Sequence, residues 1–505
     1  MGAPMMAGYP LLTILVFLPL TGVLCLLPLW QRQEWTRRIA LLFGLADLTL
    51  AGWLTLAAGS ARLLPGNSPP GFFLFEDLPW IGRLGARYTL GLDGISLLMV
   101  LLTAFVTLVG MVVSWNAIRE RSALHYALLL VMESGIMGVF LALDLFLFYL
   151  FWEVMLIPMF FLIGIWGHGR RVYSAIKFFL YTLAGSLLML LAIIGIYLLH
   201  GSQTGQYTFG LMSLTGTAIP AQAGIWLFAA FLLAFAIKFP LFPLHTWLPD
   251  AHTDAPTAGS VILAGLLLKT GAYGLIRFGY PLFPDAAKTL TPLLTGVAVI
   301  GILYASWVAF AQTDMKRLVA YSSVGHMGFV ALGIAAWTPV ALSGAVMQMV
   351  NHGVTTAALF ALVGMLDERS GTREVAAYGG LWGKVPLLSG LFLLFAMASA
   401  GLPGLNNFVG EFLILTGTFR VQPLAAVLAF LGIVLPLAYT VKLLQEVLFQ
   451  HERRPLALPD LSLREGTILT VMALIDLYLG LHPKPLLDLL NVPVALLTGL
   501  TGGAP

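Results

Sequence analysis

GIWLFAAFLLAFAIKFPLFPLHTWLPDAHTDAPTAG, residues 224–259, is the stretch of this sequence that decides the fold. Its first part, residues 224–237, carries no charge and would cover about 21 Å as a helix. Lys238 follows directly, and Pro240 and Pro243 come shortly after it. Proline lacks a backbone N–H and clashes with the preceding turn, so a helix does not continue through it. The stretch therefore predicts a membrane helix that breaks beside a buried ammonium group.

The composition of the whole chain agrees with a membrane protein. Of its 505 residues 59% are hydrophobic and only 10% are charged, and apolar runs long enough to cross a bilayer recur from end to end. The net charge of +3 excludes a basic patch for nucleic acid, and the single cysteine, Cys25, excludes a disulfide framework or an iron–sulfur cluster. We expect an all-α polytopic membrane protein.

Proline, glycine and charge clusters divide the chain into about fourteen candidate spans. The first has no basic segment before it, so we interpret it as a retained span and not as a signal peptide. Residues 60–89 are the longest interruption, and we expect them at the membrane interface as short strands or turns. The spans lie near 8–30, 39–59, 90–114, 124–142, 143–166, 173–199, 222–247, 257–279, 290–312, 318–337, 340–366, 386–418, 423–450 and 466–482.

Basic residues are unevenly distributed between the two sets of loops. The connections after odd-numbered spans hold fifteen Lys and Arg residues, against six in the even-numbered connections and the tail. The positive-inside rule then places the odd loops in the cytoplasm and both termini outside. The seventh loop, DAHTDAPT at 250–257, is an exception because it is acidic. We expect it to be buried in protein or to line water.

Two spans contain helix-breaking clusters, KFPLFP at 238–243 and GLPG at 401–404. They are the seventh and twelfth spans, so they cross the membrane in opposite directions. Discontinuous helices at matching places in two inverted halves are typical of an ion path. The sequence thus predicts two inverted five-helix repeats, spans 4–8 and 9–13. The expected divisions are 1–123, 124–279, 290–450 and 451–505.

Four ionisable residues lie in the middle of spans, and these are our candidates for function: Glu153, Lys238, Lys269 and Glu411. A charge at the bilayer centre costs at least about 2.5–3.5 kcal/mol, so each requires a partner, water or a function. Residues near span ends can reach the interface and are interpreted as structural: Lys177, Arg277 and Glu446. Both interpretations stay open for Lys442 and Glu133.

His326 and His352 also lie within spans, and imidazole can accept and release a proton near neutral pH. We favour a relay role for both, and less so for His245 and His252 at the broken seventh span. No combination of histidines and carboxylates has metal-ligand spacing, and no nucleotide-binding motif is present. We expect no metal and no cofactor on this chain.

Six stretches together resemble the antiporter-like membrane subunits of NADH:quinone oxidoreductase, which is respiratory complex I. The resemblance covers about residues 80–450. The stretches are LDGISLLMV, FWEVMLIPMFFLIGIWG, FAIKFPLFPLHTWLPDAHTDAPTAGSVILAG, LLKTGAYGL, FAQTDMKRLVAYSSVGHMGFV and LPGLNNFVGEF.

The resemblance implies a role for each candidate residue. Glu153 is expected to pair with Lys238, and Lys269 to link two half-channels. Glu411 would release protons to the outside, with His326 and His352 as the central relay. One departure is Ile262, because some relatives carry an aspartate at that position.

Two features distinguish the chain from the L- and N-type subunits of that family. Glu411 stands where those subunits are expected to carry lysine, and the long lateral helix of the L-type subunit is not expected after the fourteenth span. The resemblance then implies L- and N-type neighbours, a redox arm in the assembled complex and the lipid of a bacterial inner membrane as partners.

The function implied is proton translocation through buried Lys, Glu and His residues, driven by redox chemistry in other subunits. Two alternatives share most of these motifs: a subunit of an Mrp-type Na⁺/H⁺ antiporter, and the membrane subunit of a hydrogenase or formate hydrogenlyase. A purely structural scaffold explains poorly why four central ionisable residues accompany two broken helices.

Overall fold

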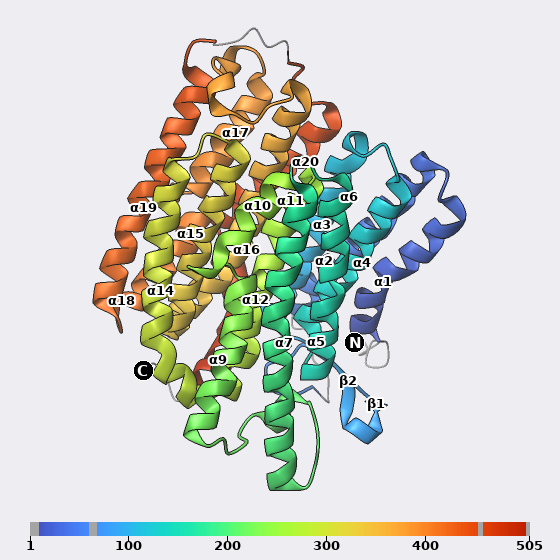
Figure 1. Ribbon diagram of the computed structural model, residues 1–505, viewed down its shortest axis with the longest axis vertical. Helices are drawn as coiled ribbons and strands as arrows, with labels where there is room; N and C mark the ends of the chain where they lie inside the picture. The colour runs from blue at the N-terminus through green and yellow to red at the C-terminus, as the bar shows by residue number, and fades with distance from the viewer. Residues whose placement is uncertain (1–9, 60–67, 453–457, 501–505) are drawn as a thin grey trace, which may run out of the picture.

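The computed structural model describes residues 10–59, 68–452 and 458–500, apart from the side chains of Gly59 and Leu500. These residues form a bundle of mostly antiparallel helices with one small hairpin (Figure 1). The helices are α1 (Leu11–Leu26), α2 (Gln33–Gly59), α3 (Gly94–Ala117), α4 (Ser122–Leu141), α5 (Leu145–Val154), α6 (Leu156–Trp166), α7 (Arg171–Thr204), α8 (Leu211–Leu214), α9 (Ala221–Lys238), α10 (Trp247–Asp254), α11 (Thr257–Ile262), α12 (Leu268–Gly274), α13 (Tyr280–Leu282), α14 (Pro284–Phe310), α15 (Met315–Ala336), α16 (Pro339–Ser370), α17 (Pro386–Ser399), α18 (Asn406–Phe419), α19 (Pro423–Leu444), α20 (Leu463–Leu481) and α21 (Lys484–Leu500).

The polytopic helical class is confirmed. Among the described residues 12 helical segments are long and apolar enough to cross a membrane, or 13 when the bent pair α20 and α21 counts as one span. The expected twelfth span is absent from that set because it is divided into α17 and α18, of 14 residues each. The count of fourteen and the division into repeats stay predictions. We did not expect α21, which the sequence interpretation treated as a tail.

A two-stranded hairpin follows the second span. Strands β1 (Leu74–Ile81) and β2 (Ala86–Leu92) pair antiparallel, and Gly85 closes their connection with a φ of 67°. The prediction of short strands is confirmed for this part, whereas 60–67 lie outside the described residues.

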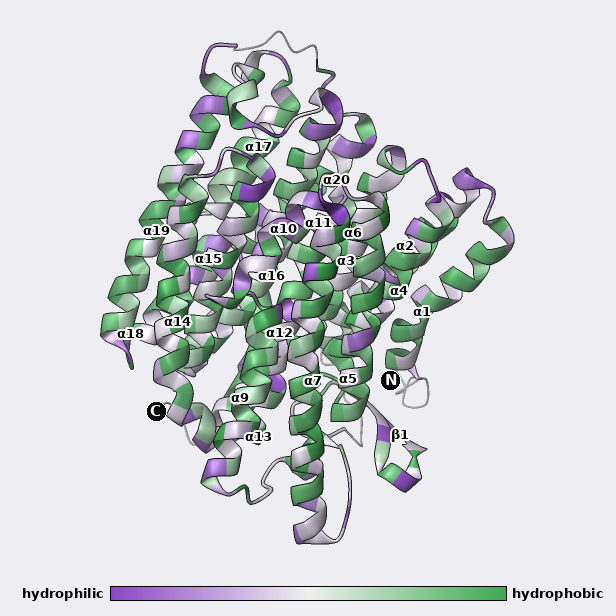
Figure 2. Ribbon diagram, in the orientation of Figure 1, coloured by the Kyte–Doolittle hydropathy of each residue, from purple (hydrophilic) through white to green (hydrophobic). Residues whose placement is uncertain are grey.

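Burial separates central helices from peripheral ones. The most apolar windows of α16 and of the span 257–282 are 100% buried, and that of α15 is 94% buried, against 28% for α2. Figure 2 shows α14 and α19 as largely green along their length, whereas hydrophilic segments interrupt α15 and α16 inside the bundle. The helices that carry Lys269, His326 and His352 are thus surrounded by protein.

Both predicted helix breaks are present. After α9 ends at Lys238, the N–H of Leu241 donates to the carbonyl of Ala236 at 2.9 Å, and the indole of Trp247 donates to that of Ile237 at 2.8 Å. These bonds satisfy carbonyls that the proline break frees. Between α17 and α18 the chain turns through Gly401, whose φ is 75°.

The eighth span is continuous but irregular. Two π-helical turns, 263–267 and 275–279, flank α12, which carries Lys269. Such wide turns are frequent at functional sites. All the side chains of this span's central turns are buried.

Candidate functional site: a buried chain of ionisable side chains

Lys269 and His352 are in direct contact in the centre of the bundle. Lys269 Nζ lies 2.7 Å from His352 Nδ1, and both residues are 0% exposed. The ammonium group also donates to the carbonyl of Ala264, within the π-helical turn that precedes α12. Because His352 Nδ1 accepts this bond, its proton in the neutral form belongs on Nε2. Nε2 has no partner among the described residues.

His326 and Glu411 form the second contact of the site. His326 Nδ1 lies 2.9 Å from Glu411 Oε1, and its Nε2 lies 3.1 Å from the hydroxyl oxygen of Ser399. The amide of Gln348 donates to the same Oε1 at 3.2 Å. His326 is 3% exposed and Glu411 is 4% exposed.

The two contacts adjoin each other. The rings of His326 and His352 have centroids 5.5 Å apart. Lys269, His352, His326 and Glu411 therefore form one chain of ionisable side chains, from α12 through α16 and α15 to α18. We call these four residues the central chain. They are brought together from four helices, as the sequence interpretation expected for the linking lysine, the relay and the terminal carboxylate.

Lys238 lies apart from the central chain. Its Nζ has no hydrogen-bond partner among the described residues, and it lies 5.4 Å from the ring centroid of Trp152 and 5.5 Å from that of Phe178. Glu153 is within electrostatic range of Lys238, but the two form no ion pair within 4 Å. The direct pair that the resemblance implied is therefore absent from this structure. The ammonium group lies instead over the faces of two aromatic rings.

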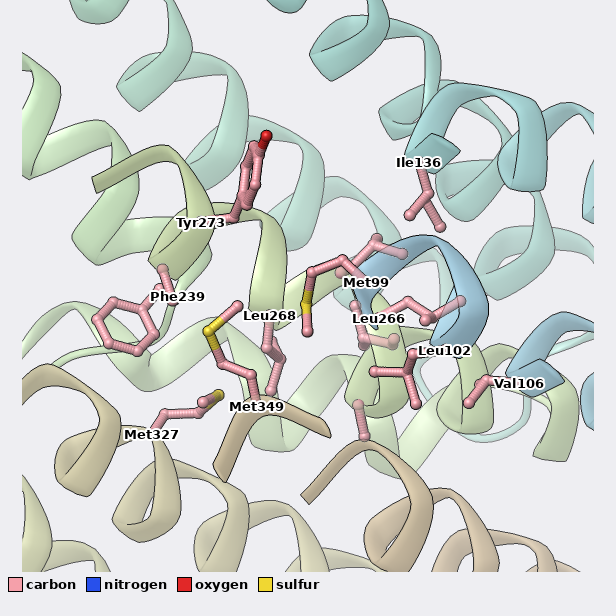
Figure 3. Packing of buried hydrophobic residues seen from close by; sticks show 14 of the residues in the cluster. Met99, Leu102, Val106, Ile136, Phe239, Leu266, Leu268, Tyr273, Met327 and Met349 are labelled. Carbon is pink, nitrogen blue, oxygen red and sulfur yellow. The ribbon is translucent and has the colours of Figure 1, made fainter. Parts of the chain in front are cut away.

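Apolar side chains fill the space beside the central chain. Four of them converge in Figure 3: Phe239 at the α9 break, Leu268 on α12, Met327 on α15 and Met349 on α16. No hydrogen bond among the described residues joins Lys238 to the central chain. A proton passing between Lys238 and Lys269 would therefore need water between them.

The acidic loop at 250–257 is held against protein, as expected from its departure from the positive-inside rule. Asp250 forms an ion pair with Lys177 at 2.6 Å, and Asp254 accepts a hydrogen bond from Ser174 at 2.6 Å. The structural interpretation of Lys177 agrees with this pair.

A cavity of about 360 Å³ opens beside the end of this loop. His168 lies on its wall outside the spans, and burial, with a smaller contribution from nearby Lys316, lowers the pKa of His168. Lys316 itself donates to the carbonyl of Ala255 at 2.5 Å. The polar residues that line the cavity include His168, Lys316, Asp367 and Glu368.

His252 lies between this cavity and the central chain. Its ring is 0% exposed, stacks on Phe360 with centroids 4.4 Å apart, and is within electrostatic range of both Lys316 and Lys269. Neither ring nitrogen has a partner among the described residues. The sequence interpretation ranked His252 below His326 and His352, and the structure gives it a more central position than expected.

Three further buried residues were not predicted, and two of them lie at the site. Gln348 and Ser399 bond to Glu411 and His326, and Asp47 on α2 contacts Glu133 on α4. The sequence could have singled out Asp47, because its carboxyl group stands in an apolar run. The contact between α2 and α4 had no signal in the sequence.

The residues expected to be structural have partners or are exposed. Arg277, which was interpreted as structural, forms a buried ion pair with Asp93 at 2.5 Å. Lys442, for which both interpretations were open, is exposed on α19. Within the part of the chain that the structure describes, no group of three or more His, Cys, Asp or Glu residues is placed to hold a metal ion.

Comparison with known proteins places this fold in one class. The family model of the NADH:quinone oxidoreductase/Mrp antiporter transmembrane subunits matches residues 142–436. A chain of respiratory complex I from Thermus thermophilus with bound NADH superimposes with a TM-score of 0.87 at 35% identity, covering 97% of this chain and 100% of that one. A chain of the Mrp complex from Dietzia sp. shares the fold, with a TM-score of 0.84 at 21% identity.

The protein is therefore an antiporter-like membrane subunit. Subunit M of NADH-quinone oxidoreductase from Pseudomonas aeruginosa is 45% identical over 94% of this chain and 95% of its own length. Subunit M from Escherichia coli K12 is 44% identical over 95% of this chain and 96% of its own. The chain belongs to the subunit M family of NADH-quinone oxidoreductase, the multi-pass membrane subunits of respiratory complex I.

Proposed function

We propose that this chain moves protons across a bacterial inner membrane as a membrane-arm subunit of complex I, through the central chain of Lys269, His352, His326 and Glu411. The observation that carries the proposal is the unbroken series of contacts between these four buried side chains. The family assignment supports a translocating complex, and the contacts support this route through the subunit.

Proton uptake begins in this proposal at the 360 Å³ cavity beside the acidic loop. Lys316 and His252 lie between that cavity and Lys269, and imidazole can carry a proton in either direction. The connections after odd-numbered spans, with their excess of basic residues, would face the cytoplasm, and both termini would lie outside.

Lys238 provides a second proton site that is controlled electrostatically. Its ammonium group has no hydrogen-bond acceptor among the described residues and depends on Glu153 and two aromatic faces for stabilisation. A change of charge arriving along the membrane arm would alter this balance and release or load the proton. Moving one charge against about 100 mV requires roughly 2.3 kcal/mol. That amount is equivalent to a change of under two pKa units.

Redox chemistry belongs to other subunits in this proposal, and the chain contributes no cofactor. Its partners would be L- and N-type antiporter-like neighbours and, in the assembled complex, the redox arm. The Mrp alternative rests on a likeness of 21% identity, which shows the fold alone.

Substitution of Lys238 tests the proposal in the assembled complex. In proteoliposomes we expect Lys238→Met to reduce proton translocation at least about tenfold. Lys442→Met is the matched control, since Lys442 is an exposed lysine of a peripheral span and should change nothing. Normal proton translocation by Lys238→Met would contradict the role of Lys238.

A further inference from the structure

A seam of buried polar side chains runs along α16 next to His352. Gln348, Asn351 and Thr355 are spaced three and four residues apart, so they share one face of the helix over about 10 Å. All three are 0% exposed. The seam begins at Glu411, which accepts from Gln348 at 3.2 Å.

The seam ends at a carboxyl group on α20. Thr355 Oγ1 lies 3.0 Å from Asp476 Oδ1 and 3.0 Å from Asn406 Oδ1. Asp476 is 0% exposed, and its Oδ2 has no partner among the described residues. No cationic side chain lies within electrostatic range of it in that part of the chain.

The hydrogen-bond inventory indicates that Asp476 carries a proton. Thr355 has one hydroxyl hydrogen but two oxygen neighbours, so it can donate to only one of them. The orientation of Asn406 is fixed because its Nδ2 donates to the carbonyl of Asn351 at 3.2 Å. Its Oδ1 therefore faces Thr355 and accepts the hydroxyl hydrogen. The second contact is satisfied only when Asp476 is protonated and donates to Thr355 Oγ1.

Other groups along the seam can bind water. The side-chain amide of Asn407 and Oδ1 of Asn351 are buried and have no partner among the described residues. Buried polar atoms of this kind are usually satisfied by water. Glu411 also borders a cavity of about 610 Å³. Phe408, Phe412 and Leu415 line it, and a proton is poorly accommodated there.

Asp476 lies just before a third interruption of a span. Five residues, about 8 Å of helix rise, separate it from the end of α20, after which α21 turns by 66° and His482 is exposed. Gly480 packs directly on the break at 401–404, since a Cβ there would lie 2.3 Å from the carbonyl oxygen of Gly404. The break beside Glu411 and the break after Asp476 thus adjoin.

We propose that Asp476 is a proton-transfer group, so that the path continues beyond Glu411 through Thr355 to a second buried carboxyl on α20. Asp476 passes its proton to water at the α20–α21 break. The hydroxyl of Thr355 then gives its hydrogen to the carboxylate and takes one from water on the Glu411 side, and that water takes the proton of Glu411. Each step moves one proton between oxygen atoms. The inference rests on the proposed function of this subunit.

Three variants in the assembled complex, reconstituted in proteoliposomes, test the proposal. Asp476→Asn keeps the shape and the contact with Thr355 but cannot transfer a proton, and we expect proton translocation to fall at least about tenfold at unchanged assembly. Thr355→Val should reduce translocation in the same way. Thr356→Val is the matched control, because the neighbouring Thr356 is buried and has no hydrogen-bond partner among the described residues, and it should change nothing.

A second measurement tests whether Asp476 is protonated. The infrared absorption of protonated carboxyl groups in the resting complex should lose one component in Asp476→Asn, which an ionised Asp476 would not predict. Glu411→Gln is measured in parallel. Loss of translocation in Glu411→Gln with normal translocation and an unchanged spectrum in Asp476→Asn would overturn the role of Asp476 alone. Normal translocation in both variants would overturn the proposed function as well.

Discussion

Lys269 Nζ lies 2.7 Å from His352 Nδ1, and both side chains are closed to the outer solvent, with an exposure of 0%. An ammonium group and an imidazole in such contact compete for one proton. Whichever group holds it leaves the other neutral, since two adjacent cations in a low dielectric repel strongly. This relationship makes the pair a point where a proton can be handed from α12 to α16.

Substitution of His352 should therefore interrupt translocation. We expect His352→Leu to reduce proton translocation by one or two orders of magnitude, because Lys269 loses its proton acceptor. His352→Gln keeps a hydrogen-bond acceptor but cannot take the proton, so it should fail equally. The measurement is proton uptake by proteoliposomes during NADH oxidation. Recovery of translocation in His352→Gln alone would show that His352 only positions Lys269.

The turn at 401–404 offers a test of how Glu411 is positioned. Gly401 and Gly404 have φ values of 75° and 94°, and a side chain at either costs about 1–2 kcal/mol of backbone strain. A Cβ on Gly401 would lie 2.9 Å from Glu411 Oε2, whereas on Gly404 the nearest atom is in Leu481 at 3.9 Å. We expect both alanine variants to lower thermal stability similarly, and only Gly401→Ala to lower proton translocation. Equal translocation in the two variants would contradict this positioning role.

The ion pair between Arg277 and Asp93 should be essential for stability. Their charged side chains are 5% and 3% exposed, and removing one partner of a buried pair costs about 3–5 kcal/mol. We expect Arg277→Met to lower the thermal midpoint of the purified complex strongly. The matched control is Arg38→Met, whose pair with Glu34 is exposed and contributes at most about 1 kcal/mol. Similar midpoints for the two variants would show that the buried pair is dispensable.

The hairpin should lose stability only at acidic pH. Hydrogen bonding to Arg87 lowers the pKa of Asp77. A carboxyl whose pKa is lowered by folding stabilises the fold above its unfolded value of about 3.9, and this contribution disappears as pH falls through the lower folded value. Because both side chains are largely exposed, the contribution is at most about 1 kcal/mol.

Hydrogen exchange of the strands measures this contribution. Protection factors of 74–92 should be constant between pH 5 and 7 and decrease below pH 4 in the wild type. Asp77→Asn should remove the decrease. A steep change near neutral pH would point to a different group.

The sequence allowed the individual charges to be predicted, but not how they are joined. Lys238, Lys269 and Glu411 stand out because an ionisable residue in an apolar run is costly, and the proline and glycine breaks mark local backbone geometry. The contact of Lys269 with His352 joins residues 83 apart, and only the packing of α12 on α16 creates it. The hydrophobic periodicity and the composition of the sequence carry no information on such a contact.

Contacts between residues distant in the sequence also explain where the structure differs from the sequence-based predictions. The resemblance implied a direct pair between Glu153 and Lys238, but the lysine lies over aromatic rings from α5 and α7 and forms no ion pair with Glu153 within 4 Å. Asp476 stands in the apolar run ILTVMALIDLYLG, and its partner Thr355 lies 121 residues away. The bend of 66° after α20 had only a proline and a histidine as a local signal.

The central claim is that protons cross through Lys269 and the three residues that follow it. The most direct test is the number of protons translocated per NADH oxidised by proteoliposomes that carry the complex with Lys269→Met. We predict that this ratio falls clearly below the wild-type value, while the complex assembles and Lys442→Met keeps the wild-type ratio. A wild-type ratio in Lys269→Met would contradict the account.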